Sequence, residues 1–329
     1  MYDNWKRKAA AFCAAALMLT GAQPPVCAED STKLRVMCMG DSITDGFWLT
    51  GGYRNTLCSM VTENGLAGRI DFVGPNWGIS TSDGYDPNHA GFSGYSIDNI
   101  AQEDSVSGGR IGLSSFMETM LETHPADVIF LQIGTNDILS LYDLDHFGER
   151  LEHLVDMILP ALPENGMLYL ATLPAMDAND HLYISEYYFT VESMDAAVAQ
   201  CNAQIKALAQ KKKAAGQPVT LADVNGVLTK ADLYDGVHPS EAGYQKLGEF
   251  WYTQLTDYLG SADRPHDAAK PGDINADGSI NTADAAILRS FLLGEPGLTA
   301  EQASRADFDG DSRLTAIDLT LLKKAAASN

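Results

Sequence analysis

VMCMGDSITDGF, residues Val36 to Phe47, is the stretch that decides the fold of this chain. Its first four residues are apolar without alternation, which is typical of a strand buried on both faces of a parallel sheet. Gly40-Asp41-Ser42 ends this run abruptly, so Ser42 is predicted to lie at the carboxyl end of a strand and to open a helix. In open α/β sheets ligands bind at that edge, and the positive end of a helix dipole would lie beneath Ser42. The position suits a nucleophile, and the alternative is that Ser42 only caps the helix.

Strand-like and helical segments alternate through the next two hundred or so residues. Expected strands are 70–74, 126–133, 167–172 and 218–224, and expected helices are 57–63, 144–159, 191–215 and 240–259. Between 75 and 94 the chain is rich in Gly, Asp, Asn and aromatic residues, and we expect a long functional loop there. This alternation predicts an α/β fold in which helices cover both faces of a parallel sheet, giving three α/β/α layers.

The first 28 residues have the pattern of a secretory signal peptide. Lys6, Arg7 and Lys8 precede an apolar run from Ala9 to Leu19, and Val26-Cys27-Ala28 resembles a signal-peptidase cleavage site. The run is too short to span a bilayer, and a valine directly before Cys27 disfavours lipid anchoring. We therefore expect a secreted, extracellular protein.

Charge and cysteine content narrow the class of protein further. The formal net charge is −22, and because 1–28 carries three cations and one anion, the remaining chain is near −24. Such a surface repels nucleic acid and anionic membranes, so neither is expected as a partner. Cleavage would leave Cys38, Cys58 and Cys201, an odd number that favours buried thiols and leaves a single disulfide open.

A serine nucleophile needs a base, a carboxylate that orients the base, and donors for the oxyanion. His238 is the candidate base, and Asp235, three residues earlier in the loop DGVHP, is the candidate orienting carboxylate. The alternative is that His238 is an exposed turn histidine.

Candidate oxyanion donors are the side-chain amide of Asn136 and the backbone N–H groups of Ser42 and Gly94. Asn136 lies in GTND, directly after the most strand-like run of the chain. The alternative for GTND is an ordinary turn that ends a strand, and the alternative for Gly94 is a glycine of a loop without a catalytic role. Because the edge of an α/β sheet would gather all of these segments, the catalytic interpretation is favoured over several independent accidents.

Four blocks of this sequence resemble, in order, those of the SGNH or GDSL hydrolases: GDSITDG, HAGFSGYSIDNI, IGTND and DGVHPS. The fuller pattern, over about Leu34 to Leu259, is similar to family three of the carbohydrate esterases, the acetyl xylan esterases, and the expected esterase domain is 31–260. The resemblance implies a flavodoxin-like three-layer fold, a Ser42, His238 and Asp235 triad, oxyanion donors at Ser42, Gly94 and Asn136, and no cofactor for catalysis. Phe92 departs from the family, which commonly has a histidine there.

Residues 261–270 are polar and contain a proline, so we interpret them as a linker, and 271–329 contains an internal repeat. Both copies have the spacing of a calcium loop, with side-chain oxygens at positions 1, 3, 5 and 12 and a backbone carbonyl at position 7. The predicted ligands are Asp273, Asn275, Asp277, Ser279 and Asp284 in the first loop and Asp307, Asp309, Asp311, Arg313 and Asp318 in the second. A solvated acidic tail would not reproduce this spacing twice.

An apolar helical pattern follows each loop, and the arrangement resembles a small all-α type I dockerin with two Ca²⁺ ions. The resemblance implies a cohesin module of a scaffoldin as partner, recognised through loop positions 10 and 11. Those positions are Thr282 and Ala283 in the first copy and Ala316 and Ile317 in the second. Because the two pairs differ, we expect one preferred docking orientation.

Together these features predict a secreted, cellulosome-attached esterase that removes acetyl groups from plant cell-wall polysaccharide, with xylan as the expected substrate. Alternatives within the hydrolases are a pectin or other carbohydrate deacetylase and a lipase or thioesterase. A non-catalytic carbohydrate-binding module is the alternative from another class. The lipase is disfavoured because the loops near the site are rich in Tyr, Trp and Gly and lack a long apolar lid.

Overall fold

The structure is a computed structural model that describes residues 33–78, 88–179, 188–260, 272–275, 280–294, 298, 300–308 and 313–326. The expected signal peptide, 1–28, and the expected linker, 261–270, lie outside the described residues.

A seven-stranded sheet forms the centre of the region from 33 to 260. Its strands are β1 (Leu34–Gly40), β2 (Ile70–Phe72), β3 (Asn76–Trp77), β4 (Asn88–Gly91), β5 (Val128–Gln132), β6 (Met167–Ala171) and β7 (Val219–Ala222). The order is β3-β4-β1-β5-β6-β7. β2 and β4 pair with the same edge of β1, β2 at the beginning of the strand and β4 at its end. Every pairing is parallel except β3 with β4. With β2 and β4 sharing one position, this is the flavodoxin-like order 2-1-3-4-5.

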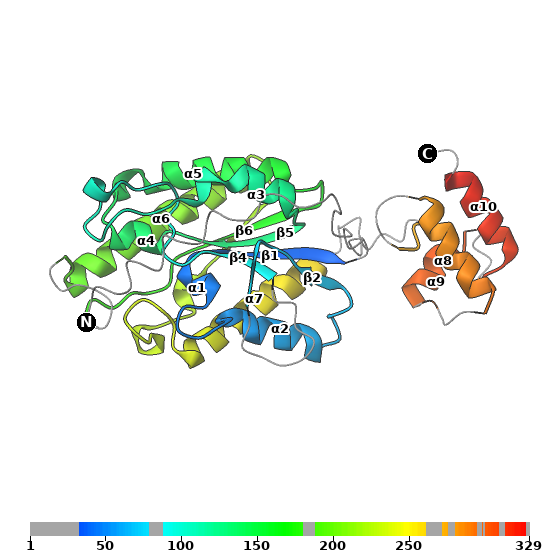
Figure 1. The fold of residues 1–329 in the computed structure, drawn as a ribbon, viewed down its shortest axis with the longest axis horizontal. Coiled ribbons are helices and arrows are strands. Elements are labelled where there is room, and N and C mark those ends of the chain that lie inside the picture. The colour runs from blue at the N-terminus through cyan, green and yellow to red at the C-terminus, as the bar shows by residue number, and fades with distance from the viewer. Residues whose placement is uncertain are drawn as a thin grey trace, which may run out of the picture. The chain divides into compact units, whose positions relative to one another are not determined.

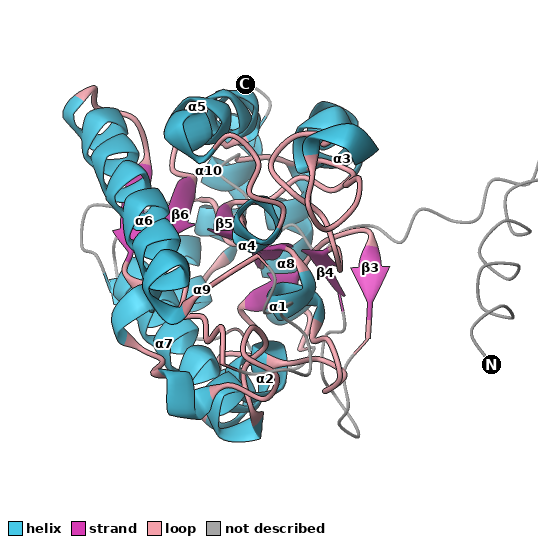
Figure 2. Cartoon of the chain, turned by 90° about the vertical axis from the view of Figure 1, so that its left-hand side faces the viewer, coloured by secondary structure: helices cyan, strands magenta, loops and turns pink. Residues whose placement is uncertain are grey.

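Helices cover both faces of the sheet and make three layers (Figures 1 and 2). On one face lie α3 (Met117–Thr123), α5 (Phe147–Ile158) and α6 (Val191–Ala214), and on the other lie α2 (Tyr53–Glu63) and α7 (Glu241–Gly260). Short 3-10 turns occupy Gln102–Asp104, Leu113–Ser115, Leu144–His146, Leu159–Ala161, Val224–Gly226 and Lys230–Asp232.

The apolar run that starts the chain's first strand is explained by this double coverage. Met37 and Met39 belong to the core under α3, α5 and α6, whereas Val36 and Cys38 belong to the core under α2 and α7. Successive side chains of a strand point to opposite faces, so a strand buried on both faces needs apolar residues at every position. The predicted α/β/α architecture is confirmed.

Two short helices lie at the carboxyl edge of the sheet. α1 (Ser42–Asp45) follows β1 and α4 (Thr135–Leu139) follows β5, and because β1 and β5 are parallel neighbours, both helices begin at the same edge. Figures 1 and 2 show α1 and α4 at the same end of the strands. This edge therefore receives the segments singled out in the sequence.

The expected long loop from 75 to 94 contains the strands β3 and β4, so the loop prediction was wrong for those residues. Asn88–Gly91 is polar and small, and it is a strand because Ala90 and Gly91 pair with Met39 and Gly40 of β1. The helices α3 and α4 were not predicted either. The buried thiols were predicted correctly: Cys38, Cys58 and Cys201 are buried and form no disulfide within the described part of the chain.

The C-terminal segment is helical, with α8 (Thr282–Leu292), α9 (Ala300–Ala306) and α10 (Ala316–Ala326). It has a small apolar core of its own, whose buried members are Ile274, Ala285, Leu288, Ala306 and Leu322. Each calcium-loop sequence leads into a helix, the first into α8 and the second into α10, as predicted.

Candidate active site

A tight turn places Ser42 at the end of β1. The side chain of Asp41 accepts a hydrogen bond from the Ile43 N–H at 3.0 Å, so Asp41 and not Ser42 caps α1. The capping alternative for Ser42 was therefore wrong. Gly40 allows β5 to approach closely, because a Cβ there would lie 2.2 Å from the Gln132 carbonyl oxygen. α1 has only four residues, so a long helix dipole does not contribute to this site.

Asp235 and His238 lie on one closed loop. The loop is fixed by a backbone hydrogen bond from Tyr234 N–H to the His238 carbonyl at 2.7 Å. Asp235 Oδ1 accepts the N–H groups of Val237 at 3.1 Å and His238 at 2.7 Å. The carboxylate is thus held by its own loop before it reaches the imidazole ring.

The structure brings Ser42, His238 and Asp235 into one chain of hydrogen bonds. His238 Nδ1 lies 2.7 Å from Asp235 Oδ2, and His238 Nε2 lies 2.8 Å from Ser42 Oγ. A carboxylate only accepts, so Nδ1 carries a proton, and in the tautomer with its one proton there, Nε2 is the acceptor that faces the serine hydroxyl. Ser42, His238 and Asp235 are 6%, 1% and 3% exposed, so the hydrogen bonds between these three side chains are shielded from bulk water.

Asp235 is in an environment that favours its charged form. Burial by itself raises the pKa of this carboxyl, but the hydrogen bonds from the His238 ring and from the backbone N–H groups of His238 and Val237 outweigh burial and hold the pKa below its ordinary value. Asp235 therefore stays ionised beside His238 at neutral pH.

Aromatic side chains that the sequence analysis did not single out line this site. The Phe47 ring lies 4.4 Å from the His238 ring, centre to centre. Trp48 stacks on Tyr234 at 4.3 Å and donates a hydrogen bond from Nε1 to the Pro239 carbonyl at 3.0 Å. These contacts tie the serine loop to the histidine loop. No sequence pattern pointed to them, because the partners lie almost two hundred residues apart.

Asn136 and Gly94, the other candidate oxyanion donors, are joined through one loop. Asn136 Nδ2 donates to the Tyr95 carbonyl at 2.8 Å, which uses one of its two N–H groups. Gly94 has a φ of +84°, a value that favours glycine. The amide of Asn136 therefore holds the segment that carries the Gly94 N–H.

Asp137 and Arg150 also hold the loop that carries Gly94, and neither was predicted from the sequence. Arg150 Nη1 lies 2.6 Å from Asp137 Oδ1, and Asp137 Oδ2 accepts the Ile97 N–H at 3.2 Å. Burial raises the pKa of Asp137 to about 6, against the lowering effect of Arg150. The only sequence signal was the position of Asp137 within GTND.

Phe92, the position at which the sequence was expected to depart from the resembled family, is part of an aromatic cluster. Its ring lies 5.1 Å from each of Tyr95 and Phe116. Phe92 therefore contributes apolar packing to the Gly94 loop.

In the C-terminal segment the structure describes Asp273, Asn275, Asp284, Asp307, Arg313 and Asp318, whereas Asp277, Ser279, Asp309 and Asp311 lie outside the described residues. Both position-12 carboxylates are fully buried and organise their loops. Asp284 accepts the N–H groups of Ile274 and Asn281, at 2.8 and 2.9 Å, and Asp318 accepts those of Phe308 and Thr315, at 2.9 and 2.8 Å.

Carboxylate and amide oxygens at these positions fit the ligand preference of Ca²⁺. Within the residues that the structure describes, no group of three or more His, Cys, Asp or Glu side chains is placed to hold a metal ion. The described donors thus supply part of each predicted ligand set. Both ligand sets stay predictions, with Asp273, Asn275 and Asp284 as the described members of the first and Asp307, Arg313 and Asp318 as those of the second.

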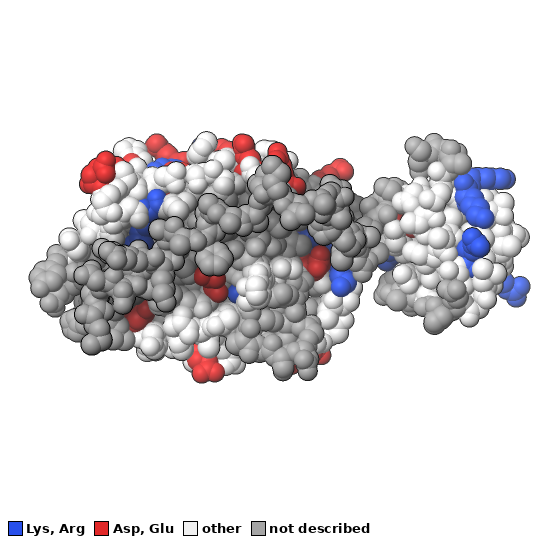
Figure 3. Space-filling model, viewed as in Figure 1, with Lys and Arg blue, Asp and Glu red and all other residues white. Residues whose placement is uncertain are grey.

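Figure 3 shows acidic and basic side chains on the described surface of the α/β region, and basic side chains on the described surface of the C-terminal helical segment. The basic residues of that segment are Arg289, Arg305, Arg313, Lys323 and Lys324.

None of the helices in the described ranges has the length and apolar character needed to cross a membrane.

A parallel α/β sheet with hydrogen-bonded serine, histidine and aspartate side chains at its carboxyl edge is an arrangement found in serine hydrolases. Residues 38–246 match the GDSL-like Lipase/Acylhydrolase family, and residues 271–325 match the dockerin type I domain. The chain belongs to the GDSL-like lipase/acylhydrolase family and carries a C-terminal type I dockerin domain. The SGNH-type fold and the dockerin resemblance are thereby confirmed.

A multidomain esterase of Ruminococcus flavefaciens is 32% identical in an alignment that covers 88% of this chain. The chain spans only 39% of the length of that curated relative. Among solved structures, a family 3 carbohydrate esterase of Clostridium thermocellum is 28% identical with a TM-score of 0.53, covering 70% of this chain and 99% of the other. A family 3 carbohydrate esterase from Talaromyces cellulolyticus is 22% identical with a TM-score of 0.55, covers 70% of this chain and all of the other, and shares the fold.

Proposed function

We propose that this chain is a secreted carbohydrate esterase that removes O-acetyl groups from plant cell-wall polysaccharide, with xylan as the first candidate. The observation that carries the proposal is the chain of hydrogen bonds from Ser42 through His238 to Asp235. The similarity to a solved family 3 carbohydrate esterase supports a carbohydrate ester as substrate.

In the proposed reaction, His238 Nε2 takes the Ser42 proton as Oγ attacks the acetyl carbonyl carbon. Asp235 keeps the Nδ1–H tautomer and stabilises the imidazolium that forms. The Ser42 and Gly94 N–H groups and the Asn136 side-chain N–H would donate hydrogen bonds to the carbonyl oxygen as negative charge develops on it.

The C–O bond to the sugar then breaks, and His238 gives its proton to the departing sugar oxygen. This leaves an acetyl group on Ser42. Water, deprotonated by the same histidine, attacks the acetyl carbon, and His238 returns that proton to Ser42 Oγ as the bond from Oγ to the acetyl carbon breaks. Acetic acid leaves with the second proton of the water and ionises to acetate in solution. The two half-reactions need no cofactor, because the protons and electron pairs balance between water, serine and histidine.

For the domains we propose a signal peptide at 1–28, an esterase at 31–260, a linker at 261–270 and a dockerin at 271–329. Dockerin type I domains bind calcium, and we propose two Ca²⁺ ions held by the ligand positions named above. A cohesin module would be the protein partner, which places the enzyme outside the cell in a cellulosome. Thr282, Ala283, Ala316 and Ile317, the residues proposed to contact it, are all exposed.

Acetate release from acetylated xylan, pectin and mannan tests this proposal. Ser42→Ala should lower turnover by about 10³-fold or more on the preferred polymer, because the nucleophile acts in the chemical step. Ser59→Ala, a serine of α2, is the matched control and should remain close to wild type. Turnover of Ser42→Ala within about tenfold of wild type would reject the serine mechanism. A wild-type chain that releases no acetate from any of the three polymers would reject the substrate class.

A further inference from the structure

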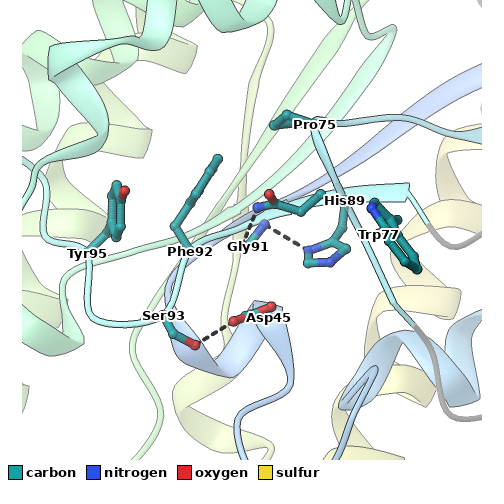
Figure 4. A pocket seen from close by; sticks show the side chains of 9 residues that line it. Asp45, Pro75, Trp77, His89, Gly91, Phe92, Ser93 and Tyr95 are labelled. Carbon is teal, nitrogen blue, oxygen red and sulfur yellow. Dashed lines mark hydrogen bonds between the residues drawn. The ribbon is translucent and has the colours of Figure 1, made fainter. Parts of the chain in front are cut away.

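A hollow of about 350 Å³ lies beside the helix that carries the nucleophile. Its walls include Asp45 at the end of α1, Trp77, His89, and Ser93 and Tyr95 on either side of Gly94 (Figure 4). Its volume lies within the range of about 300–1,000 Å³ found for small-molecule sites. Because α1 begins with Ser42 and Gly94 lies between two lining residues, the hollow adjoins the candidate active site.

Trp77 is the most exposed large apolar side chain among the described residues, at 79%. Its backbone is nevertheless fixed, because β3 pairs with β4 through Trp77 and Asn88. Next to it, Asn76 Nδ2 donates to the Gly91 carbonyl at 2.7 Å. An indole that is carried on a fixed backbone and keeps an open face can serve as a platform for a ligand, since leaving it exposed forgoes the burial that such a large ring ordinarily gains.

Arg54 fixes the distance between this platform and the nucleophile helix. It is buried, at 3% exposed, and donates to the carbonyl groups of Thr44 at 3.0 Å, Asp45 at 3.2 Å and Gly78 at 2.7 Å. The first two belong to α1 and the third follows Trp77. One buried guanidinium therefore ties both walls of the hollow together, as preorganised sites require.

The polar groups of the hollow are suited to hydroxyl groups. Ser93 Oγ donates to Asp45 Oδ2 at 2.5 Å, which orients the carboxylate (Figure 4). His89 Nδ1 accepts the Gly91 N–H at 3.1 Å, so the neutral ring carries its proton on Nε2. Burial and the nearby Arg54 lower the pKa of His89 to about 3, which keeps the ring neutral at working pH.

We propose that this hollow binds one glycosyl unit of the substrate chain, with the apolar C–H face of the sugar ring against Trp77 and its hydroxyl groups toward Asp45 and Ser93. The inference rests on the proposed carbohydrate esterase function. An aliphatic acyl chain suits the hollow less well, because it would bury the Asp45 carboxylate without a hydrogen-bond partner from the ligand.

The test compares Trp77→Ala with wild type as intact chains on two esters of acetate. The readout is the ratio of kcat/KM on acetylated xylo-oligosaccharide to kcat/KM on p-nitrophenyl acetate, which has no sugar. We expect this ratio to fall about tenfold in Trp77→Ala, and about threefold or less in Trp77→Phe, which keeps an aromatic face. Val106→Ala, which removes an exposed apolar side chain outside the hollow, should keep the wild-type ratio.

A second readout does not depend on catalysis. Calorimetry of Ser42→Ala with unacetylated xylohexaose, mannohexaose and cellohexaose should detect binding of at least one, and adding Trp77→Ala should weaken that binding about tenfold. This result would support the subsite even if no ester were cleaved, which would separately reject the proposed function.

An unchanged ratio together with unchanged binding in the Trp77→Ala variants would overturn the inference while leaving the esterase proposal standing. Absence of binding to all three oligosaccharides would also overturn it. A kcat/KM that rises with acyl length, from p-nitrophenyl acetate to the octanoate, and loses that rise in Trp77→Ala would assign the hollow to the acyl chain instead.

Discussion

Acid sensitivity of the folded state is predicted to depend on His89. This side chain is 2% exposed, and burial, followed by repulsion from Arg54, lowers its pKa from 6.5 to about 3. The unfolded chain therefore binds a proton below about pH 6.5 that the folded chain does not accept until about pH 3. The contribution of His89 to the free energy of unfolding is complete above pH 6.5, the pKa of this histidine in the unfolded chain. It falls as the pH drops from there toward about 3, the pKa in the folded chain.

The magnitude follows from the size of the shift. One pKa unit corresponds to about 1.36 kcal/mol, so lowering the pH to about two units below the unfolded value costs about 3 kcal/mol. His89→Asn removes the titration, while the amide oxygen keeps an acceptor for the Gly91 N–H. Between about pH 7 and about pH 4.5, the free energy of unfolding should therefore fall by about 3 kcal/mol less in His89→Asn than in wild type.

Urea unfolding followed by tryptophan fluorescence measures this difference. Three of the four tryptophans, Trp48, Trp77 and Trp251, lie in the α/β region, the fourth, Trp5, lies in the expected signal peptide, and none lies in the C-terminal segment, so the signal follows unfolding of the α/β region. His153→Asn changes an exposed histidine of α5 and serves as the matched control, with the pH dependence of wild type. The same loss of stability on acidification in His89→Asn and in wild type would refute the reasoning.

Three other changes have defined outcomes. Asp235→Asn should lower kcat by about 10³- to 10⁴-fold without unfolding the chain, because an amide facing Nδ1 favours the wrong tautomer of His238. Asp223→Asn is the control. An Asp235→Asn variant with the kcat of wild type would reduce the site to a Ser–His dyad. Asn136→Ala should lower kcat by about 10² to 10³, as expected for loss of one oxyanion donor, and a change confined to KM would assign Asn136 to substrate binding. In EDTA, the full chain should lose one melting transition in calorimetry, because the thin dockerin core needs its metal to fold, while p-nitrophenyl acetate turnover should continue. An unchanged thermogram would contradict the calcium proposal. Loss of turnover would contradict the independence of the two domains.

The sheet could be predicted from the sequence because its central strands are apolar at every position. Val36 to Met39 needed no partner information, since no solvated face interrupts the run. Asn88–Gly91 could not be predicted, because its four residues have little strand preference and are a strand only through pairing with β1.

The Ser42, Asp235 and His238 constellation could be predicted because each residue type is required by the chemistry and lies next to a strand-ending signal. The supports of the site could not. No sequence pattern singles out Arg54 or Arg150, and only the fold shows that Arg54 is buried against α1 and that Arg150 pairs with Asp137 next to the Gly94 loop. Long-range partners of this kind leave no local pattern.

The measurement that tests the central claim most directly is covalent labelling with a serine-reactive phosphonate, located by peptide mass spectrometry. The account predicts one adduct, on the peptide containing Ser42, that forms as acetate-releasing activity disappears and does not form in Ser42→Ala. Complete loss of activity with the adduct on another residue, or continued acetate release by a chain fully labelled at Ser42, would contradict it.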